Sequence, residues 1–302
     1  MIGYLYLLLD CVLGAYAFVF FKELTGSHET ASITLFTFVI SVLFFHAVNM
    51  HRLRAMYRKV GLGYKNVVYL NIITMVRWLT SFYGLTYIDS ATMLCIDMGM
   101  IPIAHFFAVT SPKDYKKHMS VLLSILFVLL SMGLIIHQNL VTFDTISSYQ
   151  NFCIGVFLAM IAGITGAYVG MFSEKLQKGG FAVSEILGTR FYLLLLATLG
   201  IAVWTDELSH IELADFKDYG LAALFIVIIP LFVYQKAIVH LGAFTVATYL
   251  PLTPIMAYFI ELYKGKYDFE RSTFIALMIC SIAMCAMNII KHKSLAKVGK
   301  IT

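Results

Sequence analysis

The chain has 302 residues, of which 60% are hydrophobic and only 13% are charged. This balance is far from that of a water-soluble domain and excludes one. The formal net charge is +5, but the basic residues gather in particular connections, so the charge indicates membrane topology and we expect no nucleic-acid partner.

Apolar runs close to the roughly 20 residues needed to cross a hydrocarbon core recur along the whole chain. The first run has no Lys or Arg before it and no small-residue cleavage site after it, so we expect it to be retained as a helix. Ten membrane-spanning helices are predicted at about 3–21, 31–49, 66–87, 89–109, 119–137, 151–172, 181–204, 219–239, 242–262 and 273–290. No soluble domain can be placed between them.

Lysine and arginine concentrate in the connections between spans 2 and 3, 4 and 5, and 6 and 7, and in the C-terminal tail. They are Arg52, Arg54, Arg58, Lys59, Lys65, Lys113, Lys116, Lys117, Lys175, Lys178, Lys291, Lys293, Lys297 and Lys300. Because basic connections stay on the cytoplasmic side, we expect a multi-pass protein of the cell (inner) membrane with both termini in the cytoplasm. One connection opposes this assignment, since Lys264, Lys266 and Arg271 would lie outside.

An internal repeat becomes visible when the sequence is compared with itself at an offset of 152 residues. The fragment LGAYAFVFFKEL then meets TGAYVGMFSEKL, and PIAHFF meets PIMAYF. Two five-helix halves follow, at 1–150 and at 151–302, the second ending in a basic cytoplasmic tail. Because five is odd, the second half enters the membrane in the opposite orientation. The predicted fold class is all-α, a polytopic membrane protein of ten transmembrane helices in two inverted five-helix repeats.

At these residues the chain resembles the drug/metabolite transporter superfamily in its ten-helix, EamA-like form. The resemblance covers nearly the whole chain and is carried by SATMLCIDMGMIPIAHFF at 90–107, GAFTVATYLPLTPIMAYFIE at 242–261 and EILGTRFYLLLLA at 185–197. Arg190 stands where the family often has arginine, Phe38 replaces arginine in the second span, and Glu261 keeps a common family glutamate that is missing after the fourth span. The resemblance implies a central cavity walled by the fourth and ninth spans, and secondary transport of small metabolites without ATP hydrolysis.

Asp10 is an ionisable side chain inside the first predicted span. Such a group is costly in hydrocarbon, so it faces the bundle interior, pairs with another group or lines a wet path. Gly3, Gly14 and Ala17 share its helical face, and a face of small residues packs inward. We predict that Asp10 binds a coupling proton or is the counter-charge of a cationic substrate. The alternative is a structural carboxylate that is hydrogen-bonded to a neighbouring helix.

Arg77 and Asp97 are predicted to meet. The turn between the third and fourth spans falls near Ile88, eleven residues after Arg77 and nine before Asp97, so the two lie at similar depth. Ser81 shares a polar stripe with Arg77. Two interpretations stay open, a static buried ion pair and a pair that opens to bind a zwitterion or to pass a proton. Arg77, Ser81 and Asp97 are therefore candidate substrate contacts, and Asp97 is also a candidate for proton coupling.

Aromatic side chains are a further set of candidate substrate contacts. Tyr16, Trp78, Tyr168 and Tyr249 could bind an aromatic, heteroaromatic or quaternary-cationic solute by stacking and cation–π attraction. The repeat pairs Tyr16 with Tyr168, and Tyr249 precedes prolines that can free backbone carbonyl groups for a ligand. The alternative is a position at the membrane interface, where tyrosine and tryptophan are common.

The charges in the spans leave two classes of substrate open. Asp10, Asp97 and the aromatic side chains favour an amino acid, an amine or an adenosyl- or nucleoside-type compound. The two arginines of the spans and Lys236 would suit antiport of phosphorylated or nucleotide-sugar solutes. Arg190 is a candidate contact for a carboxylate or phosphate, and the alternative is a structural contact with Glu185.

Motifs of enzymes and ATP-driven pumps are missing from the sequence. There is no carboxylate cluster for a metal–diphosphate, no nucleophile elbow and no Gly-rich phosphate loop, and the histidines are dispersed. We therefore expect no catalytic residue, metal or cofactor, and a channel is a weaker alternative than a carrier. Five cysteines inside apolar runs are expected to be core residues. The expected partners of a monomer are membrane lipid, the small-molecule substrate and a coupling proton or exchanged solute.

Overall fold

The computed structural model describes residues 2–141, 145–266 and 269–298, with side chains described as far as residue 286 except at 117, 141 and 284. Within these ranges the chain forms helices and short connections and contains no strand. The prediction of an all-α protein is confirmed. The predicted basic tail, with Lys291, Lys293, Lys297 and Lys300, lies outside the described side chains.

Fourteen α-helices follow one another within the described ranges. They are α1 (Ile2–Leu24), α2 (Thr30–Val48), α3 (Leu53–Leu62), α4 (Tyr64–Tyr87), α5 (Ser90–Val109), α6 (Met119–Val141), α7 (Ile146–Lys178), α8 (Val183–Thr189), α9 (Tyr192–Trp204), α10 (Asp215–Ala222), α11 (Ile229–Leu241), α12 (Ala243–Tyr249), α13 (Thr253–Tyr263) and α14 (Arg271–Val298). Three predicted spans are each built from two of these helices, namely α8 with α9, α10 with α11, and α12 with α13.

Eight helical stretches are long and apolar enough to cross a membrane. They correspond to the predicted spans 1, 2 and 4 to 9. The third span is α4, which has 24 residues but carries Lys65, Asn66, Asn71 and Arg77 along its length. The tenth is α14, in which the continuous stretch with described side chains, Arg271–Ala283, is apolar but too short to count as a span by itself. The structure therefore supports a multi-pass membrane protein, and the predicted count of ten spans is not confirmed by length and composition.

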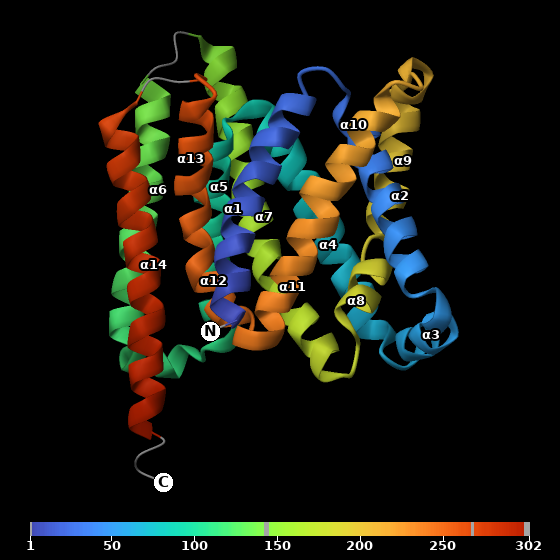
Figure 1. Cartoon of the computed structure of the whole chain (residues 1–302). Coiled ribbons are helices and arrows are strands. Elements are labelled where there is room, and N and C mark those ends of the chain that lie inside the picture. The colour runs from blue at the N-terminus through green and yellow to red at the C-terminus, as the bar shows by residue number, and fades with distance from the viewer. Residues whose placement is uncertain (1, 142–144, 267–268, 299–302) are drawn as a thin grey trace.

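The two halves of the chain make equivalent helix contacts. Helix α4 packs along α7 while α11 packs along α1, and α5 packs on α7 while α13 packs on α1. Contacts between the halves also join α5 to α13, α6 to α14, and α2 to α8 and α9. In Figure 1, α1 runs upward from the N label and α7 runs downward, so the first helices of the two halves are antiparallel.

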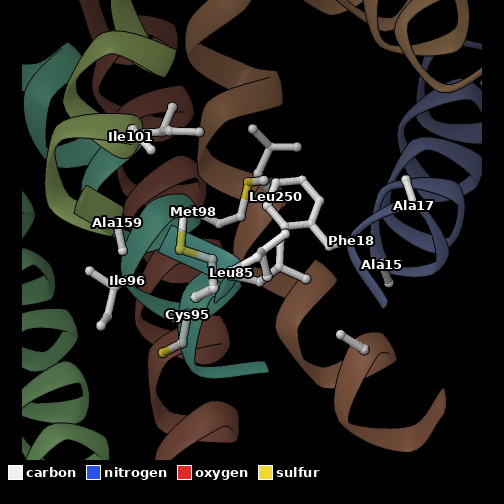
Figure 2. Close-up of a cluster of buried hydrophobic side chains, with 14 of the residues drawn as sticks. Ala15, Ala17, Phe18, Leu85, Cys95, Ile96, Met98, Ile101, Ala159 and Leu250 are labelled. Atoms are coloured by element: carbon white, nitrogen blue, oxygen red, sulfur yellow. The ribbon is translucent and has the colours of Figure 1, made fainter. Parts of the chain in front are cut away.

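Small and branched side chains fill the centre of the bundle. Figure 2 shows part of this core, in which Phe18 of α1, Met98 of α5 and Leu250 of the turn after α12 lie together. Burial of such apolar groups adds packing contacts that lipid alone would not provide. Three of the five cysteines are buried in the core as predicted, but Cys153 near the start of α7 is exposed.

Candidate functional site

A central cavity lies where both halves of the chain meet. Its walls are formed by Asp10, Gly14, Ala17, Phe18, Arg77, Trp78, Met98, Ile101, Val169, Arg190, Ile226, Pro230, Leu231, Tyr234, Leu250 and Thr253. It offers about 70 Å³ to the centres of water molecules. This is room for on the order of five waters, which is less than a metabolite needs. A substrate would therefore have to widen the cavity or enter another conformation of it.

The wall residues follow the sequence repeat. Four pairs of them are separated by 152 positions, namely Ala17 with Val169, Trp78 with Pro230, Met98 with Leu250, and Ile101 with Thr253. Equivalent positions of the two halves thus face the same space from different helices. The cavity is shared between the halves rather than contained in one of them.

Three helices are interrupted at the cavity wall. Arg190 separates α8 from α9, a π-helical segment at Ala223–Ile228 precedes Pro230, and a 3-10 turn at Leu250–Leu252 separates α12 from α13. Proline removes a backbone donor and opens the hydrogen-bond ladder. Non-helical backbone at membrane depth is tolerated where it is buried in protein or lines a wet cavity. The interruption near Pro251 and Pro254 agrees with the sequence prediction, whereas the other two were not anticipated.

Arg77 and Asp97 form the predicted ion pair. The guanidinium Nη1 lies 2.9 Å from Asp97 Oδ1, and Nη2 lies 3.2 Å from Oδ2, so the pairing is bidentate. Arg77 Nη1 also donates to the carbonyl oxygen of Ala162 in α7, at 2.7 Å. Asp97 is fully buried behind Arg77, and of the two only Arg77 reaches the cavity wall. The geometry is that of a well-satisfied, charge-assisted pair that holds α4, α5 and α7 together.

Glycines in α7 make room for this pair. A Cβ atom at Gly166 would overlap with the Arg77 guanidinium, and one at Gly163 would overlap with the carbonyl oxygen of Asp97. Small residues at helix interfaces let backbones approach closely in a membrane. The repeated glycine of the TGAY fragment therefore has a physical role in the second half, as the seat of the Arg77 side chain.

Asp10 lines the cavity and interacts electrostatically with Arg77, but it forms no salt bridge at contact distance within the described residues. Its side chain is buried, at 7% exposure, and no hydrogen bond to its carboxylate is formed by the residues that the structure describes. The predicted alternative, a structural carboxylate bonded to a neighbouring helix, is therefore not what the structure contains. An unpaired carboxylate next to a cavity is available to a cation or proton.

Arg190 is the most unusual group of the cavity. It is only 1% exposed, and its Nε and Nη1 atoms have no hydrogen-bond partner among the described residues. Its guanidinium lies 4.8 Å from the ring centre of Phe191. The predicted structural contact with Glu185 is wrong, because Glu185 pairs with Lys59 at 2.7 Å and accepts from the backbone of Ala182. A buried guanidinium without a counter-charge is costly, which points to an anionic group as its missing partner.

Of the other candidate residues, some line the cavity in the structure and others lie away from it. Trp78 lines the cavity, and its indole N–H finds no acceptor in the described part of the chain. Ser81 is buried one turn farther along α4 and does not reach the cavity wall.

The three tyrosines lie outside the wall. Tyr16 stacks on Phe20, Tyr168 is 37% exposed on the outside of α7, and Tyr249 packs edge-on against Tyr4.

Tyr234, Pro230 and Thr253 line the cavity but were missed in the sequence. Thr253 has a buried hydroxyl without a partner among the described residues. Pro230 in the middle of the eighth span was the available signal, because a proline there marks interrupted backbone and Tyr234 follows one helical turn later on the same face.

No group of three or more His, Cys, Asp or Glu side chains that could hold a metal ion occurs within the described residues. The cavity chemistry therefore rests on one carboxylate, one free guanidinium, one paired guanidinium and the hydroxyl and indole groups beside them.

Apolar helices of membrane length around a charged internal cavity define the class of this chain, a multi-pass membrane protein. The model of the EamA-like transporter family matches residues 153–289. The second half of the chain is thus similar to the EamA-like transporters, a family of the drug/metabolite transporter superfamily, and the resemblance inferred from the sequence is confirmed. Similarity to a transporter family is consistent with a protein that is not an enzyme.

Solved structures share the fold over nearly the whole length. Among 18 matching chains, one titled "Crystal structure of protein" has a TM-score of 0.57 and 13% sequence identity, with 94% of this chain and 98% of that chain covered. At this identity the likeness concerns the fold alone. No curated protein matches the sequence.

Proposed function

We propose that the chain is a secondary transporter that carries a small metabolite, an amino acid, amine or adenosyl- or nucleoside-type compound, by alternating access through the central cavity. The observation that carries this proposal is the presence in one cavity wall of a buried acid and a buried base, Asp10 and Arg190, neither of which has a hydrogen-bond partner within the described residues. Similarity of the second half of the chain to a transporter family supports the same class of function.

The charges of the site favour a zwitterion. Arg77 and Asp97 neutralise each other, so Asp10 and Arg190 remain as one negative and one positive group. The ammonium group of a substrate could pair with Asp10, and the carboxylate of the same substrate could pair with Arg190. Of the solutes proposed, those with an amino-acid moiety meet this requirement best, because each end of the moiety removes one desolvation penalty.

Antiport of phosphorylated or nucleotide-sugar solutes is the second candidate, and Arg190 favours it. The remaining support is weak. Arg77 is already engaged by Asp97, Lys236 lies 5.5 Å from the ring centre of Phe232 and outside the cavity wall, and Asp10 would repel a phosphate. Arg77 and Arg190 therefore do not form a free pair of cations.

We infer a ten-helix arrangement in two inverted halves, with α4 and α14 as the spans beyond the eight apolar ones. The antiparallel α1 and α7, the equivalent contacts of the two halves and the paired wall residues support it. We also infer a monomer in the cell (inner) membrane with both termini cytoplasmic. Labelling of engineered cysteines from each side of the membrane tests the topology, and an odd number of crossings would contradict it.

Counterflow in proteoliposomes tests the function. The purified protein is loaded with one member of a panel of amino acids, amines, nucleosides and sugar phosphates, and uptake of its labelled form is measured. We expect saturable counterflow for an amino-acid-type solute, lost in Asp10→Asn and in Arg190→Gln. Lys236→Gln, which removes a cation outside the cavity, is the matched control and should transport as the parent does. Non-saturable flux, or counterflow of sugar phosphates alone, would contradict the proposal.

A further inference from the structure

Glu261, near the end of α13, is a buried acid that does not line the central cavity. We infer that its carboxyl group is the proton-binding site that couples transport to a proton gradient, at a place separate from the substrate. The inference rests on the proposed transport function. It replaces Asp97 in the coupling role, because Asp97 is held by Arg77 in a bidentate pair.

The surroundings of Glu261 suit a carboxyl group that takes up and releases a proton. The side chain is 1% exposed, Oε1 accepts only one long bond, from the Ser90 backbone N–H at 3.3 Å, and Oε2 has no donor within the described residues. The hydroxyl of Ser90, which lies beside it, is also without a partner there. A carboxylate with one weak hydrogen bond is poorly stabilised away from water, and a proton on it removes that penalty.

A pocket next to Glu261 gives the proton a route. It is lined by Asp89, Ala91, Thr92, Asn139, Tyr258, Glu261, Glu270 and Thr273, and it offers about 110 Å³ to water centres. Several waters fit in such a space, and the polar side chains among its lining residues can bind them. Glu270 is exposed, so the pocket leads from solvent to the buried oxygen of Glu261. It is distinct from the central cavity, with which it shares no wall residue.

Charged groups face Glu261 from each packed segment that carries one. Lys22 comes from α1, Asp89 from the corner between α4 and α5, Lys266 from the segment after α13, and Glu270 from the start of α14. Helix α6 contributes the amide of Asn139 to the same pocket. Lys266 is also paired with Glu23 at 3.1 Å, so Lys22 is the cation near Glu261 that has no acid within salt-bridge distance among the described residues. The acids near Glu261 outnumber the cations that are free to neutralise them, which favours protonation of the most buried acid.

Glu261 also joins elements that have to separate if this end of the molecule opens. Its bond to Ser90 ties α13 to the start of α5, and Lys22 donates to the carbonyl oxygen of Leu85 in the same corner. The closed corner keeps water from Glu261 and favours its protonated form, whereas opening of the corner would admit water and favour release of the proton. Lys22 and Asp10 are on one helix, about 18 Å apart at 1.5 Å per residue, so α1 connects the proton site with the substrate cavity.

Gradient-driven uptake by Glu261→Gln tests the inference. In proteoliposomes we expect a pH gradient to drive accumulation of a substrate by the parent protein. The glutamine variant, which cannot ionise, should keep counterflow but lose stimulation by the gradient. Glu212→Gln, an exposed acid in the connection before α10, is the matched control and should respond as the parent does. A gradient response that survives in Glu261→Gln, or a parent that shows counterflow but ignores the gradient, would overturn the inference.

Two further measurements separate the inference from the transport function. Infrared difference spectra of parent and Glu261→Gln protein report a protonated carboxyl group without any substrate. We expect a carboxyl band that disappears on alkaline titration and is missing in the variant, and identical spectra would overturn the proton site. A Na⁺ gradient at constant pH should drive nothing, and Na⁺-driven uptake that depends on Glu261 would contradict a proton. Absence of counterflow with every solute would instead count against the proposed function.

Discussion

At the scale of single residues, two arginines of the same cavity are in opposite situations. Arg77 shares two hydrogen bonds with a fully buried Asp97, whereas Arg190 is buried without an acceptor among the described residues. A buried pair is strongly stabilised against loss of one member, because the charge that remains is uncompensated. An unpaired buried charge has the opposite effect and destabilises the protein until a ligand neutralises it.

This contrast predicts the stabilities of variants. Arg77→Met leaves Asp97 buried and unpaired, and we expect it to lower the free energy of unfolding by about 3–5 kcal/mol. Removing both charges, in Arg77→Met/Asp97→Leu, should restore much of the loss. Arg190→Met is the matched single change and should leave thermal stability unchanged or higher. Thermal unfolding of the detergent-purified variants is the measurement, and a large loss in Arg190→Met would indicate a hidden structural partner.

At the scale of helices, the cavity is formed where helices pack closely against one another and where three helices are interrupted. Helix α7 brings Gly163 and Gly166 against α5 and Arg77, while the broken helices α8–α9, α10–α11 and α12–α13 each present an irregular segment to the same space. The continuous helices thus carry the ion pair, and the interrupted ones supply Arg190, Tyr234 and Thr253.

The close packing of α7 against α5 can be tested at Gly163. The Cβ of Gly163→Ala would overlap with the backbone carbonyl oxygen of Asp97, which cannot move as freely as a side-chain tip. We expect a loss of about 1–3 kcal/mol in stability, as for other overpacked sites. Gly200→Ala in α9 meets open space and is the control, with a neutral or slightly favourable effect. Equal unfolding temperatures of the two variants would contradict tight packing between α5 and α7.

At the scale of the whole molecule, polar contacts hold the bundle at both ends. At the end where α1 and α13 finish, Glu23 pairs with Lys264 at 2.7 Å and Lys266 at 3.1 Å. At the opposite end, Glu174 of α7 accepts from the backbone N–H of Ala243 at 2.9 Å, where α12 begins. Both ends of the bundle are therefore held by polar contacts, and the space between them is small.

We expect loss of either contact to open the cavity toward one side only. The Glu23 pairs are partly exposed and are worth up to about 1 kcal/mol, yet that changes a two-state ratio by about fivefold. In a cysteine-free background with Thr253→Cys in the cavity, Glu23→Ala should speed labelling by an impermeant maleimide from the face where α1 ends. Glu174→Ala should do so from the other face. Faster labelling from the same face in both variants would contradict two opposed gates.

Much of this arrangement could be read from the sequence. The positions of the helices follow from apolar length, the meeting of Arg77 with Asp97 follows from their equal distance to the turn near Ile88, and the break after Tyr249 follows from two prolines. These features depend on the distance along a helix axis, which the number of residues between two positions determines.

The rotation of each helix about its axis was decided only by the tertiary structure. Tyr168, a predicted substrate contact, faces outward, whereas Tyr234, which was not predicted, lines the cavity. Glu185, the predicted structural partner of Arg190, is paired with Lys59 instead. The physical reason is that lipid and protein interior are both apolar, so the pattern of hydrophobic residues does not mark the inward face of a membrane helix. Which buried charges find partners and which wait for a ligand depends on that rotation.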